Sequence, residues 1–280
     1  MSLKSSAIWT VLAVALVTAG PTRAEHSWND YHWARTSSPF ELRVVDSVTP
    51  AWQFAFDQSL IEWDRSSKLD NLVAAADDGA RTRKRCRTVA GQMRVCNAAY
   101  GQNGWLGLAS INLDANGHIT QGYAKMNDSY DWYFAQNPGE DNHVMCQEIG
   151  HVYGLGHTSE DGSSQGTCMD YSSSLNSQWP NAHDYQQLDS IYAHLDSYNS
   201  YDDGSSGGDG DGGGGGCNAP PGKGCNKSGV PAGVPDGAIR VHHRPGRDGQ
   251  LGHADFVLPD GRGGLWLWHV TLLPEDAQPR

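Results

Sequence analysis

The sequence predicts an α+β domain, because strand-like and helix-like segments alternate along it. Residues 40–48 are strand-like, and a helical stripe of apolar side chains follows at residues 52–63. Two more strand-like runs, 105–113 and 118–126, flank Asn116-Gly117, a pair typical of a tight hairpin turn. Residues 144–152 and 181–195 show the apolar spacing of helices. We therefore expect a sheet containing a β-hairpin, covered by helices.

The first helix is predicted from its capping residues and its apolar stripe. Thr49 is a favoured capping residue, and Pro50 suits the first helical position. The apolar side chains that follow recur at three- and four-residue spacing: Trp52, Ala55, Phe56, Leu60 and Trp63. Such a stripe is typical of a helix packed on a core, and we expect this helix to end near residue 64.

The composition divides the chain into four parts. Residues 1–24 combine Lys4, an apolar run and small residues before Ala24, as in a signal peptide cleaved there. Residues 25–197 are long enough for one domain with a sizeable core. Residues 198–216 are mostly Gly, Ser and Asp, which predicts a flexible linker. Residues 217–280 form a small tail rich in Cys, Gly and Pro, with β-like runs at 254–258 and 265–273. It is either a small β-unit or a poorly ordered extension, and we slightly favour the extension.

Charge, hydropathy and cysteines narrow the classes of function. The formal net charge of -12 argues against a nucleic-acid partner, and after the signal peptide no apolar run is long enough to span a membrane. Six cysteines in an exported chain favour disulfides, although six allow about 15 pairings. We prefer the sequential pairs Cys86–Cys96, Cys146–Cys168 and Cys217–Cys225. We expect a secreted protein, extracellular or periplasmic, and leave its oligomeric state open.

The candidate chemistry lies in residues 147–157, Gln-Glu-Ile-Gly-His-Val-Tyr-Gly-Leu-Gly-His. Gln147 and His151 are one helical turn apart, so their side chains share a helix face. Gly154 can end this helix and let the chain turn, so that His157 returns to the same point. The three side chains could converge on one metal ion, with Glu148 beside them as a general base.

The segment resembles the zinc signature of metzincin proteases, H-E-x-x-H-x-x-G-x-x-H, and residues 167–171, Thr-Cys-Met-Asp-Tyr, are similar to their Met-turn. The resemblance is to matrixin-like proteases of bacterial type and covers about residues 31–196. It implies a zincin domain with a twisted mixed sheet, an active-site helix, a Met-turn and a C-terminal helix. It also implies Zn²⁺ as cofactor and a protein or peptide substrate, with Glu148 taking a proton from zinc-activated water.

The resemblance also assigns roles to neighbouring segments. An extended substrate would add to an edge strand supplied by the 105–126 hairpin. Met169 would lie beneath the metal as an apolar floor. Tyr171 would either help to stabilise the oxyanion or simply pack. A Cys146–Cys168 disulfide would fasten the metal-binding helix to the Met-turn.

Gln147 departs from the family pattern, which has His at this position. An amide oxygen is a weaker zinc donor than an imidazole nitrogen. In one interpretation Gln147 and the two histidines of the motif hold zinc in a working endopeptidase. In a second, Glu160 or Asp161 supplies the third ligand. In a third, the domain is degenerate and binds extended peptides or a partner protein without cutting. Because a binding-only domain needs no base, Glu148 favours catalysis, and we predict a secreted zinc metalloendopeptidase.

The remaining histidines are predicted to lie outside the site. His143 precedes His151 by eight residues, roughly 12 Å along a helix, which is too far for both to share one ion. We expect His143 to be exposed, and His118 and His183 to lie at the surface. The histidines of the tail lack ligand spacing, so we expect no second metal site among them: His242, His243, His253 and His269.

Overall fold

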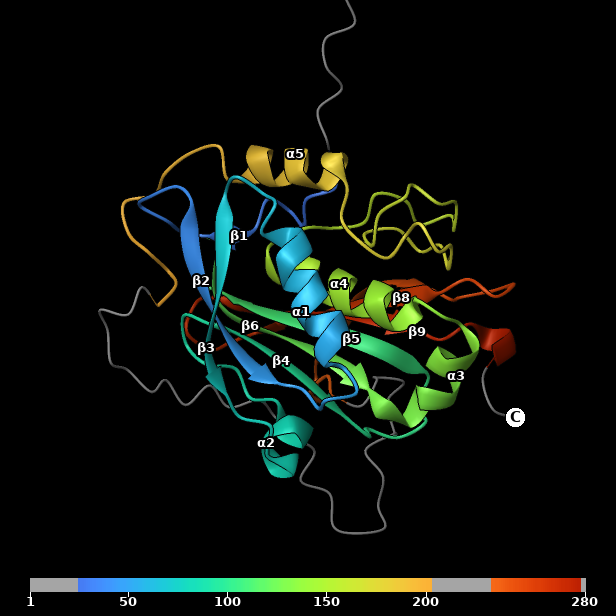
Figure 1. Ribbon diagram of the computed structural model, residues 1–280. Helices are drawn as coiled ribbons and strands as arrows, with labels where there is room; N and C mark the ends of the chain where they lie inside the picture. The colour runs from blue at the N-terminus through green and yellow to red at the C-terminus, as the bar shows by residue number, and fades with distance from the viewer. Residues whose placement is uncertain (1–24, 203–232, 278–280) are drawn as a thin grey trace, which may run out of the picture.

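The computed structural model describes residues 25–202 and 233–277 (Figure 1). The predicted signal peptide, most of the predicted linker and the Cys217–Cys225 pair lie outside these residues. The described chain is α+β, as predicted, with a nine-stranded mixed sheet and five α-helices. None of the described helices is long and apolar enough to cross a membrane.

The sheet contains nine strands in the described residues. They are β1 (His32–Trp33), β2 (Phe40–Ser47), β3 (Leu69–Ala76), β4 (Met93–Ala98), β5 (Trp105–Leu113), β6 (His118–Asn127), β7 (Ile239–Arg244), β8 (Gly252–Pro259) and β9 (Leu265–Leu272). The order is β3-β2-β4-β6-β5-β9-β8-β7, and β1 also pairs with β6. Pairing is parallel from β3 through β2 and β4 to β6, and antiparallel from β6 through β5 to β7.

The helices are α1 (Gln53–Trp63), α2 (Ala80–Arg85), α3 (Asp131–Gln136), α4 (Glu140–Val152) and α5 (Ala182–Ile191). The predicted stripe of α1 is confirmed, because all five of its apolar side chains are buried. The predicted start of α1 is wrong by three residues. The Thr49 hydroxyl accepts a hydrogen bond from Asn97 Nδ2 (3.0 Å), and the helix begins at Gln53 after a turn.

Helix α4 runs in front of the sheet in Figure 1, beside α1. Glycines in the strands beneath it make this close packing possible. A Cβ atom added to Gly107 of β5 would lie 2.5 Å from Glu148 Oε1, and one added to Gly122 of β6 would lie 2.7 Å from Val152 Cγ1. Real Cβ atoms do not approach so closely. The two glycines therefore set the depth at which α4, and the side chains it carries, lie over the sheet.

The C-terminal strands extend the same sheet, so the slight preference for a poorly ordered tail is wrong. The β-like runs predicted at 254–258 and 265–273 are strands β8 and β9. Strand β9 pairs antiparallel with β5 from Trp105↔Leu272 to Leu113↔Leu265. The predicted 105–126 hairpin is confirmed as β5 and β6, but β5 is not an edge strand. Neither strand of the hairpin is free to serve as the edge strand that the resemblance expects, because β4 pairs with β6 and β9 pairs with β5.

Candidate metal centre

Helix α4 and the turn after it bring two histidines together. His151 lies in the last turn of α4 and is buried. Gly154 follows with φ 97°, where a Cβ atom would collide with the carbonyl oxygen of Tyr31, so the turn requires glycine. The chain then returns, and His157 Nε2 lies 3.0 Å from His151 Nε2. Zinc–nitrogen distances of about 2.0–2.1 Å place two tetrahedral ligands roughly 3.3 Å apart, close to this separation.

A third histidine, His269, comes from the C-terminal strand β9. Its Cα partner on β5 is Ala109, directly beneath α4. The His269 ring centroid lies 4.0 Å from that of His151 and 4.6 Å from that of His157. One ligand atom from each of the three rings lies within 4.8 Å of the other two. We call these residues the three-histidine cluster.

The hydrogen bonds around the cluster fix the proton positions on two of its rings. His151 Nδ1 donates to the Leu155 carbonyl oxygen (2.8 Å), and His269 Nδ1 donates to Asp255 Oδ1 (2.8 Å). Burial lowers the pKa of His151 well below its usual range and that of His269 to about 3, so both rings are neutral at pH 7. Their Nε2 atoms therefore carry lone pairs. Lone pairs that converge in a buried space repel one another unless a cation or a hydrogen-bond donor lies between them.

Gln147 is buried beside this cluster, with hydrogen bonds at both ends of its amide. Its Nε2 donates to the Asp170 carbonyl oxygen (3.0 Å), and its Oε1 accepts from the Thr271 hydroxyl (2.9 Å). The amide thus joins α4 both to the segment that resembles a Met-turn and to β9. As a third zinc ligand, Gln147 stays a prediction.

Glu148 is fully buried next to the cluster. The single Thr271 hydroxyl proton is shared between Gln147 Oε1 and Glu148 Oε1 (2.6 Å), and Thr271 Oγ1 lies 3.5 Å from His269 Nε2, which places the carboxylate beside the histidines. Among the described residues no donor makes a well-formed hydrogen bond to Glu148 Oε2. Burial raises the pKa of Glu148 well above its usual range, although hydrogen bonds from Thr271 and the Ala109 backbone act in the opposite direction. A buried carboxylate of this kind holds a proton more strongly than one in water.

Tyr171 contacts the three-histidine cluster, and Met169 packs against α4. The Tyr171 hydroxyl lies 2.6 Å from His157 Nε2 and 3.3 Å from His269 Nε2. Burial raises the pKa of Tyr171 well above its usual range, so the phenol stays protonated and can donate. Met169 is buried against α4, since a Cβ atom added to Gly150 would lie 2.5 Å from Met169 Sδ.

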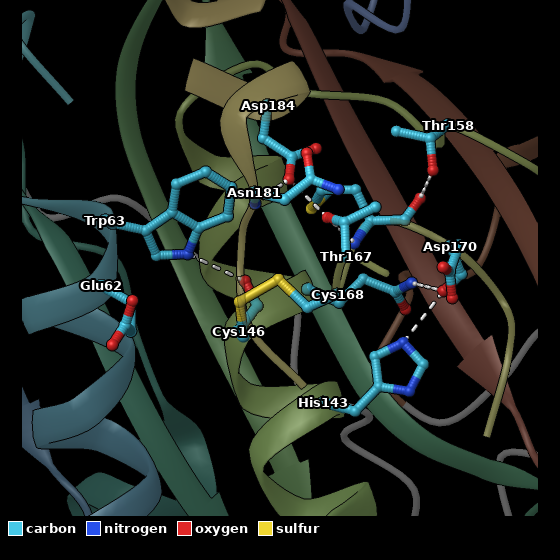
Figure 2. Close-up of a disulfide and its surroundings, with 12 residues drawn as sticks. Glu62, Trp63, His143, Cys146, Thr158, Thr167, Cys168, Asp170, Asn181 and Asp184 are labelled. Atoms are coloured by element: carbon cyan, nitrogen blue, oxygen red, sulfur yellow. Dashed lines mark hydrogen bonds between the residues drawn. A yellow bond between two sulfur atoms is a disulfide. The ribbon is translucent and has the colours of Figure 1, made fainter. Parts of the chain in front are cut away.

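The predicted Cys146–Cys168 disulfide is present and joins α4 to this segment (Figure 2). The predicted Cys86–Cys96 disulfide is also present. The prediction that His143 is exposed is wrong: it is buried, and its Nε2 donates to the Asp170 carbonyl oxygen (2.9 Å), as Figure 2 shows. This hydrogen bond joins His143 of α4 to the segment that contains Met169.

The two acidic candidates for the third ligand lie farther out. Glu160 Oε1 is 3.8 Å from His157 Nδ1, and the Glu160 side chain is 44% exposed. Asp161 is exposed and accepts hydrogen bonds from Ser159 (2.6 Å) and Ser163 (2.8 Å) within its own loop. Of these two residues, only Glu160 belongs to a group of potential ligands, with His157 and His253.

Sequence reasoning missed His269, His253 and Asp255, because their spacing is not that of ligands on a helix or in a zinc finger. The relevant signal has the two-residue period of a strand. His253 and Asp255 alternate on β8, and His269 and Thr271 alternate on β9, so each pair shares one sheet face. In addition, Asp255 is the Cα partner of His269.

Comparisons with protein-family models, with curated proteins and with solved structures find no match for this chain. The metzincin interpretation therefore stays a prediction from the residues of the motif.

Proposed function

We propose that this protein is a zinc-dependent metallopeptidase that the described arrangement holds in a closed form. Its zinc ligands in this proposal are His151, His157 and His269, with Glu148 as the general base. The observation that carries the proposal is the buried carboxylate of Glu148 beside three converging imidazoles. A domain that only binds peptides has no need of such a carboxylate. The two disulfides are compatible with an oxidising compartment, as expected for a secreted protein.

The donor set fits zinc. Three neutral imidazoles are a common ligand set for catalytic zinc, which keeps a further coordination position open. Each ring can offer a lone pair, and Asp255 holds His269 as carboxylates commonly hold metal-binding histidines. Zinc bound there would polarise a peptide carbonyl and lower the pKa of a water molecule to about 7.

The side chains around the cluster can move protons and stabilise charge. Glu148 Oε2 is the atom available to accept a proton, and the raised pKa of the carboxylate lets it keep that proton until a leaving amine takes it. The Thr271 hydroxyl holds the other carboxylate oxygen in place. The Tyr171 hydroxyl, which stays protonated, can donate a hydrogen bond to an oxyanion that develops between His157 and His269.

Access to this site is closed by β9. An extended peptide could pair with β5 only after the Leu265 end of β9 separates from it while His269 stays in the site, because each side of a strand pairs with one neighbour. The end at Leu265 is the more accessible, since this residue is 37% exposed whereas Leu273 at the other end is fully buried. We therefore expect weak peptidase activity that rises when the β5–β9 pairing is loosened at the Leu265 end.

The test uses the full chain loaded with zinc, a broad peptide library, and Glu148→Gln. The proposal expects cleavage that both Glu148→Gln and a chelator abolish, with zinc still bound to the variant. Asp161→Asn is the matched control, because Asp161 is an exposed acid of the loop after His157 and belongs to none of the groups of potential ligands among the described residues. Loss of cleavage in Asp161→Asn, but not in Glu148→Gln, would contradict the assigned base.

A disulfide lock tests the closed form directly. Leu113 and Leu265 are Cα partners at the accessible end of the β5–β9 pair, so Leu113→Cys with Leu265→Cys should form a bond on oxidation. We expect the oxidised variant to lose cleavage and the mildly reduced one to regain it, with the unsubstituted protein under the same reductant as control. Equal cleavage in both states would show that substrate does not enter along β5.

The coverage of β5 favours one alternative, a zinc-containing domain that does not cut. Strand β9 fills the position of a substrate, and Glu148 is fully buried beneath it. Full zinc occupancy, together with no cleavage in either state of the locked variant, would establish this alternative and remove the peptidase proposal.

A further inference from the structure

Beyond the three-histidine cluster, potential ligands continue across the C-terminal strands. In the register of the sheet, His242 of β7 is the Cα partner of Asp255 of β8, and Asp255 is the Cα partner of His269 of β9. His253 is two residues before Asp255, so it shares the sheet face of Asp255. Strand pairing alone thus puts two histidines and a carboxylate beside the cluster.

We propose that a second divalent metal ion binds next to the three-histidine cluster, held by His242, His253 and Asp255. The proposal concerns metal binding and does not depend on peptidase activity. Nitrogen and carboxylate ligands of this kind suit Zn²⁺. The structure brings one ligand atom from each of the three residues within 4.8 Å of the others.

The distances within this group resemble those of a ligand shell. His253 Nε2 lies 3.1 Å from His242 Nδ1, close to the roughly 3.3 Å between tetrahedral zinc ligands. Asp255 Oδ2 lies 3.7 Å from His242 Nδ1. Glu160 reaches the group from its loop, with Oε1 3.8 Å from His253 Nε2, and can supply a fourth oxygen.

The environment of the group leaves ligand atoms available to an ion. His253 is fully buried, and its Nε2 is the atom that faces His242 Nδ1. Asp255 uses Oδ1 to accept from His269, which leaves Oδ2 for the second group. His242 is about half exposed, so an ion can enter from solvent on the β7 side.

The two metal sites would lie side by side, and Asp255 would take part in both, as the partner of His269 in the first and as a ligand in the second. The His253 ring centroid lies 5.2 Å from that of His157 and 5.9 Å from that of His269. A second ion would bind Asp255 through Oδ2 while Oδ1 continues to orient His269. It would therefore tie the β7–β8 pair to the first site and stabilise β9 in its place on β5.

Zinc stoichiometry of the full chain tests this proposal. The chain is stripped with a chelator, dialysed against Zn²⁺, and its metal content measured by mass spectrometry. We expect about two zinc ions per chain, and about one in His242→Ala, whose exposed position makes misfolding a minor concern. His243→Ala is the matched control, because the next residue of a strand points to the opposite face, and it should keep about two.

Each outcome decides the question. The second site is overturned if His242→Ala binds as many zinc ions as the unsubstituted chain. His253→Gln gives an independent check and should also lose one ion. If His269→Ala loses one ion and His242→Ala loses the other, both sites stand. If His242→Ala loses an ion while His269→Ala loses none, the second site survives and the three-histidine centre of the proposed peptidase fails.

Discussion

Replacement of His269 by alanine gives the sharpest test of the metal centre. A structural zinc site with four ligands contributes about 10–16 kcal/mol of binding free energy, or roughly 3–4 kcal/mol per ligand. Removing one imidazole should therefore weaken zinc binding by about 10²–10³-fold. Because His269 lies in β9, about 160 residues from Ala109 on β5 in the sequence, this effect would show that the C-terminal strand completes the site in solution.

The zinc affinity of His269→Ala is compared with that of a second variant, Gln147→Met. Gln147 donates to the Asp170 carbonyl oxygen and accepts from Thr271, so its loss should lower the free energy of unfolding by about 1–3 kcal/mol. It should change zinc affinity by less than about tenfold, since Gln147 would act only by supporting the ligands. Affinities are measured by competition with a chromophoric chelator. A large loss in Gln147→Met and a small one in His269→Ala would refute our ligand assignment.

Two further predictions concern the surroundings of the site. Replacing Cys146 and Cys168 by alanine should lower the free energy of unfolding by about 3 kcal/mol in denaturant titrations and weaken zinc binding, because the bond joins α4 to the Met169 segment. The Cys86 and Cys96 double variant should lose similar stability but keep its zinc affinity; equal zinc loss in both would contradict the fastening role. Burial lowers the pKa of Lys125 from 10.5 to about 7. Between pH 7 and 10.5 the unfolded chain therefore binds this proton more strongly than the folded one. The free energy of unfolding should rise with pH over this range. Lys125→Met should abolish this rise and be more stable than the unsubstituted protein at pH 7, by ~2–5 kcal/mol; an unchanged pH profile would show that Lys125 stays charged in the fold.

The parts of the fold that local sequence determines were predictable. The Asn-Gly turn specifies the β5–β6 hairpin, and the apolar stripe specifies α1. Gly154 marks the turn after α4, which brings His151 and His157 within 3.0 Å. Each of these signals is contained in a short stretch of the chain, so no knowledge of distant pairing is needed to interpret it.

The third histidine of the cluster could not be predicted in this way. His269 reaches the cluster only because β9 pairs with β5, and hydropathy alternation does not say which strands become neighbours. The exposure of His143 was misjudged for a related reason. Its helix position was correct, but the segment that covers it comes from residue 170, beyond the reach of a helical pattern.

Position 147 has Gln where the signature has His, and His269 of β9 joins the cluster instead. We consider these two features together. An imidazole at 147 would place a second ring on the same side of the cluster, where Thr271 and the Asp170 carbonyl oxygen already require a side chain that both accepts and donates. A glutamine amide does both at once, whereas a neutral imidazole bound to zinc has only one remaining donor and no acceptor. Glutamine therefore suits a centre in which β9 supplies the third nitrogen. On this argument Gln147→His would not restore a conventional site, because it would remove the hydrogen bond between Thr271 of β9 and residue 147 of α4 and leave Thr271 with Glu148 Oε1 as its acceptor.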